Sequence, residues 1–345
     1  MPYLQRIDDR RSYSNFGPLV TELEARLAQR MGVDPGCVVT VANGTVGLTL
    51  ALQAVVESSA GYCLIPSWTF VATAHAVSGA GLTPFLVDVD EGSWALTPDI
   101  ARDALSRIDG PVAAVMPVAP FGAPLDVDAW DRFTEQTGIP VVIDAAAGHD
   151  AVRPGSSPAV VSLHATKILG AGEGGYVVCR RPAAITEIRQ RSNFGFYGSR
   201  DARMVGTNAK MSEYHAAVGL AAMDAYSNDV SGYRAVAEAY RQRLSRRQQI
   251  GFQAGFGSAW CGSVCVARFF GADQARLMAR LEAVGISSRA WWGAGVHLQT
   301  AFAGLPHLPL PVTEMLARET LGLPYFVDMT DTDVERVCRI IEHAF

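Results

Sequence analysis

Short apolar runs alternate with longer helical segments through the first half of the chain. Runs with the length of a buried strand lie at 38–41, 62–65, 84–87, 112–116, 141–143 and 160–163. Helical stretches between them include 46–56, 69–79 and 97–105. An alternation of strands and helices is typical of βαβ units. We therefore expect an α/β fold with a mostly parallel central sheet flanked by helices.

The second half of the chain has a different pattern. Residues 187–211 are polar and contain glycines, which predicts a long loop over an active site, because loops of this length in compact domains are usually functional. A long helix is expected at 212–247, with an interruption near Asn228. The segments after it indicate a compact α+β unit, with a strand at 261–266 and helices at 272–284 and 331–345.

Chain length indicates two domains. The chain has 345 residues, more than the roughly 250–300 residues at which single hydrophobic cores stop growing. We place the boundary inside the long helix. The expected division is a large α/β domain at 1–230 and a small C-terminal α+β domain at 231–345.

Composition and charge exclude several classes of protein. Apolar residues make up 49% of the chain and charged residues 18%, as in a globular enzyme. The net charge is −5, and no cluster of Lys or Arg is long enough to follow a phosphate backbone, which argues against nucleic-acid binding. No window reaches the ~18 apolar residues of a membrane span. The N-terminus lacks the apolar core of a signal peptide, and the six cysteines form no Cys-x-x-Cys pair, so we expect a cytoplasmic location.

One lysine stands out by its position. Lys167 follows an apolar strand and precedes the glycine-rich run 170–175 and a second apolar strand at 176–179. A lysine held in a partly dry pocket can lose its proton and attack an aldehyde or ketone. The alternative is an ordinary solvated lysine. The glycines also match a dinucleotide-binding string, but that motif should open a helix, and here it runs into a strand.

An aspartate lies upstream of this lysine. Asp144 closes the apolar run 139–143, and ligand groups in open α/β sheets lie at the carboxyl ends of strands. An aspartate against a pyridine nitrogen makes pyridoxal phosphate (PLP) an electron sink. The alternative is a helix cap for residues 145–147.

A turn earlier in the chain could bind an anion. The strand at 38–41 is followed by Asn43-Gly44-Thr45 and then by an apolar helix. Such a helix N-terminus offers free N–H groups and the positive end of its dipole to a phosphate. The alternative is a plain strand-to-helix turn with Thr45 as the N-cap.

Together these segments resemble the DegT/DnrJ/StrS family of PLP-dependent nucleotide-sugar aminotransferases, almost from end to end. The matching stretches are Asn43-Gly44-Thr45, Pro66 to Thr73, Asp88-Val89-Asp90, Asp144-Ala145-Ala146, Ser162 to Lys167, Glu173-Gly174-Gly175, Asn208 to Glu213, Val296 to Gln299 and Leu323-Pro324. The resemblance implies the fold of PLP fold-type I, which is that of aspartate aminotransferase.

The resemblance also implies a role for individual residues. Lys167 would be the catalytic lysine that binds the cofactor covalently, Asp144 would pair with the pyridinium nitrogen, and Phe70 would stack on the ring. Donors for the phosphate would be Gly44, Thr45, Val46 and Ser162, together with Asn208 from the other subunit of a homodimer with shared active sites. Substrate contacts are expected at His164, Arg191, Tyr197 and His297, and no metal is expected.

Two positions depart from the family pattern. Ala147 stands where glutamine usually contacts the cofactor oxygen, so that contact is missing or comes from elsewhere, with His149 as one source. Lys210 stands where arginine is usual. A branch of the family that removes hydroxyl groups has histidine in place of the lysine, so Lys167 favours transamination.

The expected function is therefore amino transfer, with glutamate as donor and a nucleotide-linked 3- or 4-keto-6-deoxy sugar, dTDP-linked or similar, as acceptor. Three alternatives remain at this stage. The acceptor could be a cyclitol or another cyclic ketone. The chain could bind PLP as a regulator without catalysis, or it could be a nicotinamide oxidoreductase that uses the glycine string.

Overall fold

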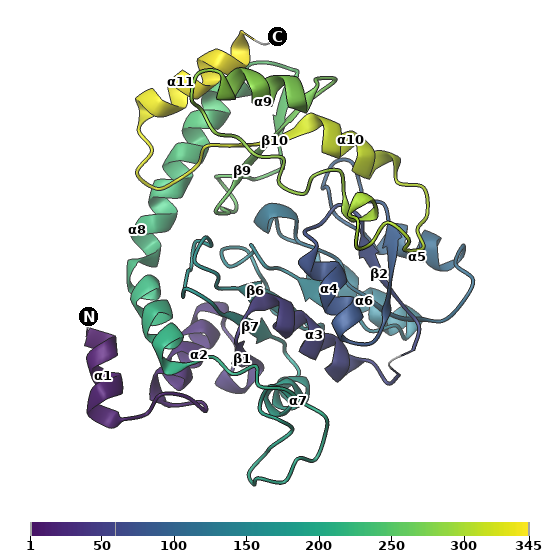
Figure 1. Cartoon of the computed structure of the whole chain (residues 1–345), viewed down its shortest axis with the longest axis vertical. Coiled ribbons are helices and arrows are strands. Elements are labelled where there is room, and N and C mark those ends of the chain that lie inside the picture. Colours follow the sequence, from purple (N-terminus) through teal and green to yellow (C-terminus); the bar gives the residue numbers. More distant parts are fainter. Residues whose placement is uncertain (1, 59, 344–345) are drawn as a thin grey trace.

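A computed structural model describes residues 2–58 and 60–343, and its central feature is a long twisted sheet (Figure 1). Three strands pair in the order β3-β2-β4, and four more pair in the order β1-β7-β6-β5. Parallel bridges between Val115 and Val141 and between Val118 and Asp144 connect the two groups. The strands are β1 (Val38–Val41), β2 (Tyr62–Pro66), β3 (Thr83–Val87), β4 (Val112–Val115), β5 (Ile143–Asp144), β6 (Ala159–Ser162) and β7 (Gly175–Val178).

The prediction of a mostly parallel sheet is confirmed. Strand β2 is parallel to both β3 and β4, and β5 is parallel to β6. Strand β7 is the exception, because it runs antiparallel to both β6 and β1. The link from β6 to β7, residues 163–174, contains Lys167 and the glycine-rich run but no helix, and parallel neighbours are usually joined by a helical crossover.

Helices cover both faces of this sheet and bury its apolar residues. Helices α3 (Gly44–Val55), α4 (Ala72–Gly79) and α7 (Pro182–Ser192) pack on one face. The other face is covered by α2 (Pro18–Met31), α5 (Pro98–Leu105), α6 (Val127–Thr137) and the first half of α8 (Glu213–Leu244). Helix α1 (Pro2–Arg10) packs beside α8.

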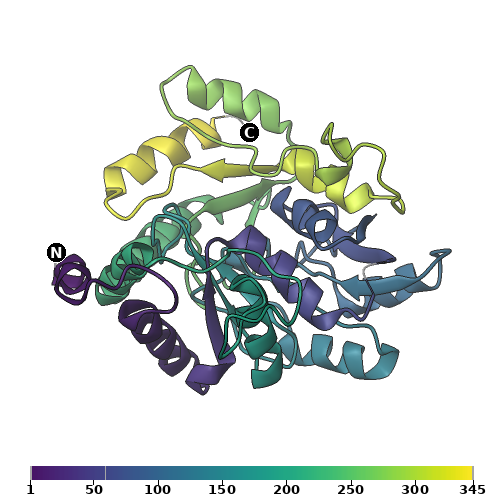
Figure 2. The same ribbon diagram turned by 60° about the horizontal axis from the view of Figure 1, so that its bottom comes forward.

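A second hydrophobic core forms beyond the middle of α8, and its elements gather on one side of the large sheet (Figure 2). It contains the antiparallel sheet β10-β9-β8. Its elements are β8 (Ile250–Phe252), β9 (Cys265–Phe269), α9 (Gln274–Glu282), β10 (Thr320–Leu323) and α11 (Asp331–Glu342). Helix α10 (Pro311–Glu319) contacts β9 and α9, and its Leu316 packs into a smaller cluster with Trp68 and Phe121. The expected boundary at 230 falls inside α8, whose residues from Val236 onward join this second core.

Four local predictions are wrong. Helix α8 continues through Asn228 without a break, because Tyr226 and Val230 pack into the core on either side of that residue. Residues 187–192 belong to α7, so the loop starts at Asn193. The C-terminal strand begins at Cys265, four residues later than expected. The predicted last helix ends at Glu342, and residues 344–345 lie outside the described part of the chain.

The second core is tied to the edge of the large sheet. The Asp88 carboxylate accepts hydrogen bonds from the backbone N–H groups of Val312 and Thr313, at 2.8 and 2.7 Å, and so caps α10. The segment around His307 pairs with Leu86 of β3. This gives the Asp88-Val89-Asp90 motif a structural role. In the described ranges no helix is long and apolar enough to cross a membrane.

Candidate active site

Asp144 lies at the end of β5 with its carboxylate buried and bonded. Its Oδ2 accepts a hydrogen bond from Thr73 Oγ1 at 2.8 Å, and its Oδ1 accepts one from the Ala146 N–H at 3.1 Å. Residues 145–147 form a turn, so the alternative of a cap for a helix at those residues is wrong. Sequence reasoning missed Thr73, although it lies within the quoted motif, because its distance from Asp144 along the chain hides the contact.

Lys167 and Asp144 are near enough to influence each other's charge. Burial lowers the pKa of Lys167, and the negative charge of Asp144 opposes that change. Burial also raises the pKa of Asp144, against the hydrogen bonds from Thr73 and Ala146 and the positive charge of Lys167. Desolvation disfavours both charged forms. The site therefore holds a lysine that loses its proton more easily than a solvated one, beside a supported carboxylate.

A tight turn fixes the backbone of Lys167. The Lys167 N–H donates to the His164 carbonyl at 2.9 Å, and the His164 N–H donates to Ser162 Oγ at 3.2 Å. The His164 ring is exposed, with Nδ1 3.0 Å from Thr166 Oγ1 and Nε2 3.4 Å from a Glu173 oxygen. The structure therefore brings the imidazole, a carboxylate and the Lys167 turn together.

The N-terminus of α3 lies directly against Ser162. A Cβ added to Gly44 would lie 3.2 Å from Ser162 Cβ, so glycine permits this close approach. The Asn43 side chain accepts the Val46 N–H at 2.9 Å, so the N-cap is Asn43, and the alternative that assigned it to Thr45 is wrong. The N–H groups of Gly44 and Thr45 have no acceptor within the helix. With the Ser162 hydroxyl, they can bind a phosphate in this structure, while the Val46 N–H is already occupied.

The Phe70 ring is open to solvent, with 59% of the residue exposed. It lies between β2 and α4, three residues before Thr73, which bonds to Asp144. An exposed aromatic ring next to the supported carboxylate is available to stack on a planar ligand.

In the described part of the chain, no hydrogen bond or ion pair joins Lys167 to Arg191, Tyr197 or Asn208. Figure 1 shows the 193–211 loop extending outward from α7. Arg191, at the end of α7, is paired with Glu187 at 2.7 Å, and Tyr197 is exposed. Asn208 is exposed and accepts a hydrogen bond from Lys210 Nζ at 2.8 Å.

Two histidines named from the sequence are buried. His297 is bonded through Nδ1 to Ser67 Oγ at 2.8 Å, three residues before Phe70, and burial lowers its pKa. His149 bonds to the Tyr176 hydroxyl at 2.9 Å. Tyr176 belongs to the core on the α2 and α8 face, whereas Asp144 bonds to α4 on the opposite face. The idea that His149 replaces the missing glutamine contact is therefore wrong.

The donor set fits PLP. The carboxylate of Asp144 suits the ring nitrogen, the amine of Lys167 suits the aldehyde, and the free N–H groups of the α3 N-terminus beside the Ser162 hydroxyl suit the phosphate. No group of three or more His, Cys, Asp or Glu side chains that could hold a metal ion occurs in residues 2–58 and 60–343.

The comparisons with known proteins agree with this chemistry. The chain matches the DegT/DnrJ/EryC1/StrS aminotransferase family over residues 1–342. It is 31% identical to dTDP-4-amino-4,6-dideoxy-D-glucose transaminase of Shigella dysenteriae over 251 residues, 71% of this chain and 66% of that protein.

Two solved structures have the same fold. One is a Bacillus cereus ATCC 10987 protein named as a PLP-dependent aminotransferase, with a TM-score of 0.92 at 29% identity over 99% of this chain and 95% of that one. The other is DesI in the presence of its TDP-sugar product, with a TM-score of 0.88 at 33% identity over 99% and 88%. The fold is therefore that of PLP fold-type I, and the chain is a PLP-dependent aminotransferase of the DegT/DnrJ/EryC1/StrS family.

Proposed function

We propose that this enzyme transfers an amino group from glutamate to the keto group of a nucleotide-linked 3- or 4-keto-6-deoxy sugar. The observation that carries the proposal is the partly buried Lys167 close to the buried carboxylate of Asp144, with the α3 N-terminus at Gly44 packed against Ser162. Sugar substrates are supported by the names of the relatives, which include a dTDP-sugar transaminase and DesI with its TDP-sugar product.

Lys167 carries the covalent and proton-transfer steps in this proposal. Burial keeps its Nζ neutral at a lower pH than a solvated lysine, which makes it a nucleophile. With PLP bound, Nζ of Lys167 would hold its aldehyde carbon, and the same amine would serve as general base and acid for the proton on the carbon that bears the amino group. Bound PLP supplies the electron-withdrawing ring for this chemistry.

The remaining residues hold and orient the cofactor. Asp144 keeps a negative charge at the ring nitrogen, and Thr73 and the Ala146 N–H favour that charge by donating hydrogen bonds to it. The N–H groups of Gly44 and Thr45, with the Ser162 hydroxyl, bind the phosphate at the N-terminus of α3. Phe70 covers one face of the ring.

We also propose a homodimer in which Asn208 of one subunit reaches the phosphate in the other. Asn208 is exposed and is held by Lys210 in its own chain. Apolar residues near Asn208 in the sequence are exposed: Val205 is 87% exposed, and Tyr214 is exposed and stacks on Tyr13. An apolar surface of this kind commonly marks a protein interface.

We propose a cytoplasmic location for the enzyme. All six cysteines are free and buried, which suits a reducing compartment.

The test of the proposed function uses the fact that the chain has only two lysines, Lys167 and Lys210. We expect Lys167→Ala to lose the visible absorbance of lysine-bound PLP and all amino transfer, because the other lysine, Lys210, is hydrogen-bonded to Asn208 and, among the described residues, has no carboxylate like Asp144 beside it to pair with the ring nitrogen. Lys210→Arg is the matched control and should retain the absorbance. The measurements are the absorbance spectrum with PLP, its loss on addition of glutamate, and turnover with a panel of nucleotide-linked keto sugars.

Amino transfer that persists in the Lys167→Ala variant would overturn the proposal. Bound PLP that does not respond to glutamate in the parent enzyme would exclude glutamate as donor. A panel in which only cyclic ketones without a nucleotide react would favour the cyclitol alternative.

A further inference from the structure

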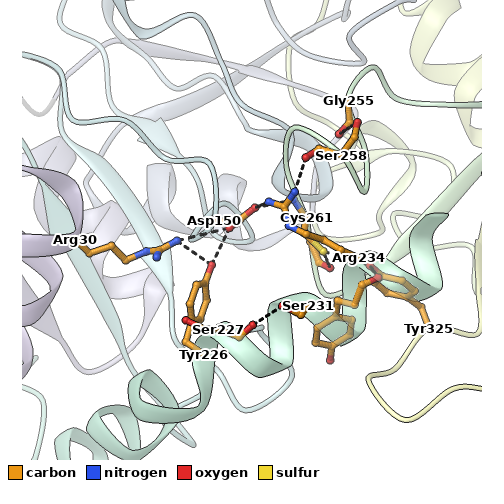
Figure 3. Close-up of polar contacts among 12 residues, drawn as sticks. Arg30, Asp150, Tyr226, Ser227, Ser231, Arg234, Gly255, Ser258, Cys261 and Tyr325 are labelled. Atoms are coloured by element: carbon orange, nitrogen blue, oxygen red, sulfur yellow. Dashed lines mark hydrogen bonds and ion pairs between the residues drawn. The ribbon is translucent and has the colours of Figure 1, made fainter.

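A buried carboxylate outside the proposed cofactor site is the centre of a cluster that connects distant parts of the chain (Figure 3). The Asp150 side chain is 9% exposed. It accepts hydrogen bonds from Arg234 Nη2 at 2.7 Å, from the Tyr226 hydroxyl at 3.0 Å and from the Cys261 N–H at 3.0 Å. Arg30 Nη2 lies 3.6 Å from the same carboxylate.

These partners come from three separate places in the fold. Arg30 belongs to α2, and Tyr226 and Arg234 belong to α8. Cys261 lies in the segment that leads into β9 of the second core, and Arg234 also donates to the Ser258 carbonyl in that segment. A buried charge is tolerated only when it is paired and hydrogen-bonded. The position of Asp150 is therefore fixed from several directions.

The cluster lies only six residues from Asp144, and the intervening turn has little freedom. The Ala145 N–H donates to the Val160 carbonyl at 2.9 Å, and the Gly148 N–H donates to the Ala145 carbonyl at 2.7 Å. The Ala147 carbonyl lies 2.6 Å from where a Cβ of Gly122 would be. A displacement at Asp150 cannot be absorbed by a loose linker, since the linker is bonded and packed along its length.

Both ends of the proposed cofactor site depend on this turn. The Ala146 N–H donates to Asp144 Oδ1 at 3.1 Å, and the Ala146 carbonyl accepts the Ser162 N–H at 3.2 Å. Asp144 is the carboxylate proposed for the ring nitrogen, and Ser162 carries a hydroxyl proposed for the phosphate. Catalytic groups that move by about 1 Å commonly lose around 100-fold in rate.

We propose that Asp150 is a positioning residue for the cofactor. By fixing the 145–150 turn, it places the Ala146 peptide, which in turn orients Asp144 and Ser162. The inference rests on the proposed role of Asp144. It also implies that the second core, through Cys261 and Ser258, influences the charge state of the lysine-bound cofactor.

The test compares Asp150→Asn with Asp131→Asn. Asp131 is a matched control, because its carboxylate also ties the connection between β5 and β6, at the Ser156 and Ser157 N–H groups, 2.8 and 3.0 Å away. Asp131 holds the far end of this connection, and Asp150 holds the end next to Asp144. Three quantities are measured for each variant: the free energy of unfolding without PLP, the dissociation constant for PLP, and the pH midpoint of the visible absorbance.

We expect Asp150→Asn to weaken PLP binding by roughly 10-fold or more and to shift the pH midpoint. Asp131→Asn should lower the free energy of unfolding without changing the dissociation constant for PLP or the pH midpoint. Tyr226→Phe removes one hydrogen-bond donor to Asp150 and no charge, so it should shift the pH midpoint in the same direction by a smaller amount. This variant replaces Asp150→Asn in the test if Asp150→Asn does not fold.

An Asp150→Asn variant with the parent's dissociation constant and pH midpoint, whatever its stability, would show that Asp150 is only structural. A parent protein without a visible band, or a band that persists in Lys167→Ala, would instead contradict the proposed function. The two failures are therefore distinguishable in one set of spectra.

Discussion

At the scale of single residues, the site depends on the burial of two ionisable side chains and on a glycine that has no Cβ. Lys167 and Asp144 are both taken out of water, so each prefers its neutral form more than it would in solvent. Gly44 contributes by lacking a Cβ, since that atom would lie 3.2 Å from Ser162 Cβ. Both features follow from contacts between segments that are distant in the sequence.

Gly44→Ala tests the proposed phosphate site. The new Cβ would press on Ser162, so we expect PLP to bind roughly 10-fold more weakly, although alanine is the better helix former. The measurement is the dissociation constant for PLP. Gly36→Ala is the control, because no atom lies within 4 Å of a Cβ at that position. Unchanged PLP affinity in Gly44→Ala would place the phosphate elsewhere.

His149 makes the stability of the fold depend on pH. Burial, with a smaller effect of Arg30, lowers its pKa to about 3 from the model-peptide value of 6.5. Below pH 6.5 the imidazole is protonated in the unfolded chain but stays neutral in the folded chain. The free energy of unfolding therefore falls as the pH falls from 6.5 toward 3. The maximal slope is about 1.4 kcal/mol per pH unit.

We expect His149→Phe to remove this part of the pH dependence between pH 6 and pH 4. Urea unfolding at several pH values gives the slope. Tyr176→Phe is the control, since it deletes the hydrogen-bond partner but keeps the imidazole, and its slope should match the parent. Equal slopes in the parent and His149→Phe would contradict the prediction.

At the scale of elements, helix ends are satisfied by groups far away in the chain. Helix α2 starts after Gly17, which has no side chain to cap it. The fully buried Glu213 carboxylate, at the start of α8, accepts the Leu19 and Val20 N–H groups at 2.9 Å each. One carboxylate therefore caps α2 and holds it beside α8. Residues 208–213 match the family pattern, and this contact gives Glu213 a structural role.

Glu213→Ala should destabilise the fold by about 3 kcal/mol, because two buried N–H groups lose a charged acceptor. Chemical unfolding measures the free energy. Glu335→Ala is the control, since Glu335 forms an exposed pair with Arg339, and such pairs contribute at most about 1 kcal/mol. A loss in Glu213→Ala no larger than in the control would argue against the cap.

At the scale of the whole molecule, α8 connects the core on one face of the large sheet to the second core, and we propose a second subunit. The division at 230 remains a proposal, because α8 crosses it and contributes to both cores. The outward loop at 193–211 and the exposed Asn208 make no hydrogen bond or ion pair with their own Lys167 in the described chain. A symmetric dimer would place them at the partner's site.

Mixed dimers test this arrangement. Lys167→Ala and Asn208→Ala subunits, each inactive alone, should together recover about one quarter of the parent's activity, since random pairing gives half mixed dimers with one intact site each. Co-expression with two different tags allows the mixed dimer to be isolated. Lys167→Ala paired with Ser162→Ala should recover nothing, because both groups serve the same subunit's site. Mixed dimers of the first pair without activity would contradict shared sites.

The strand–helix alternation, the Lys167 turn, Asp144 and the Gly44 turn could be recognised in the sequence, because each depends on neighbours within a few residues. Strand periodicity, a carboxylate at a strand end and a glycine before a helix are local signals. They were sufficient to predict the α/β fold, and the resemblance of the whole set of segments to the family was needed to predict the PLP chemistry. The local signal at Asn228 predicted a break in α8 that does not occur, because the packing of Tyr226 and Val230 outweighs the low helix propensity of asparagine.

Contacts across long chain separations were decided only by the tertiary structure. Thr73 supports Asp144, His149 lies on the far face of the sheet, and Asp150 ties α2, α8 and the second core together. Each depends on which strand lies beside which and on which face a side chain occupies. A one-residue change of register would reverse that face, and the one-dimensional pattern of residues carries no information about such pairings.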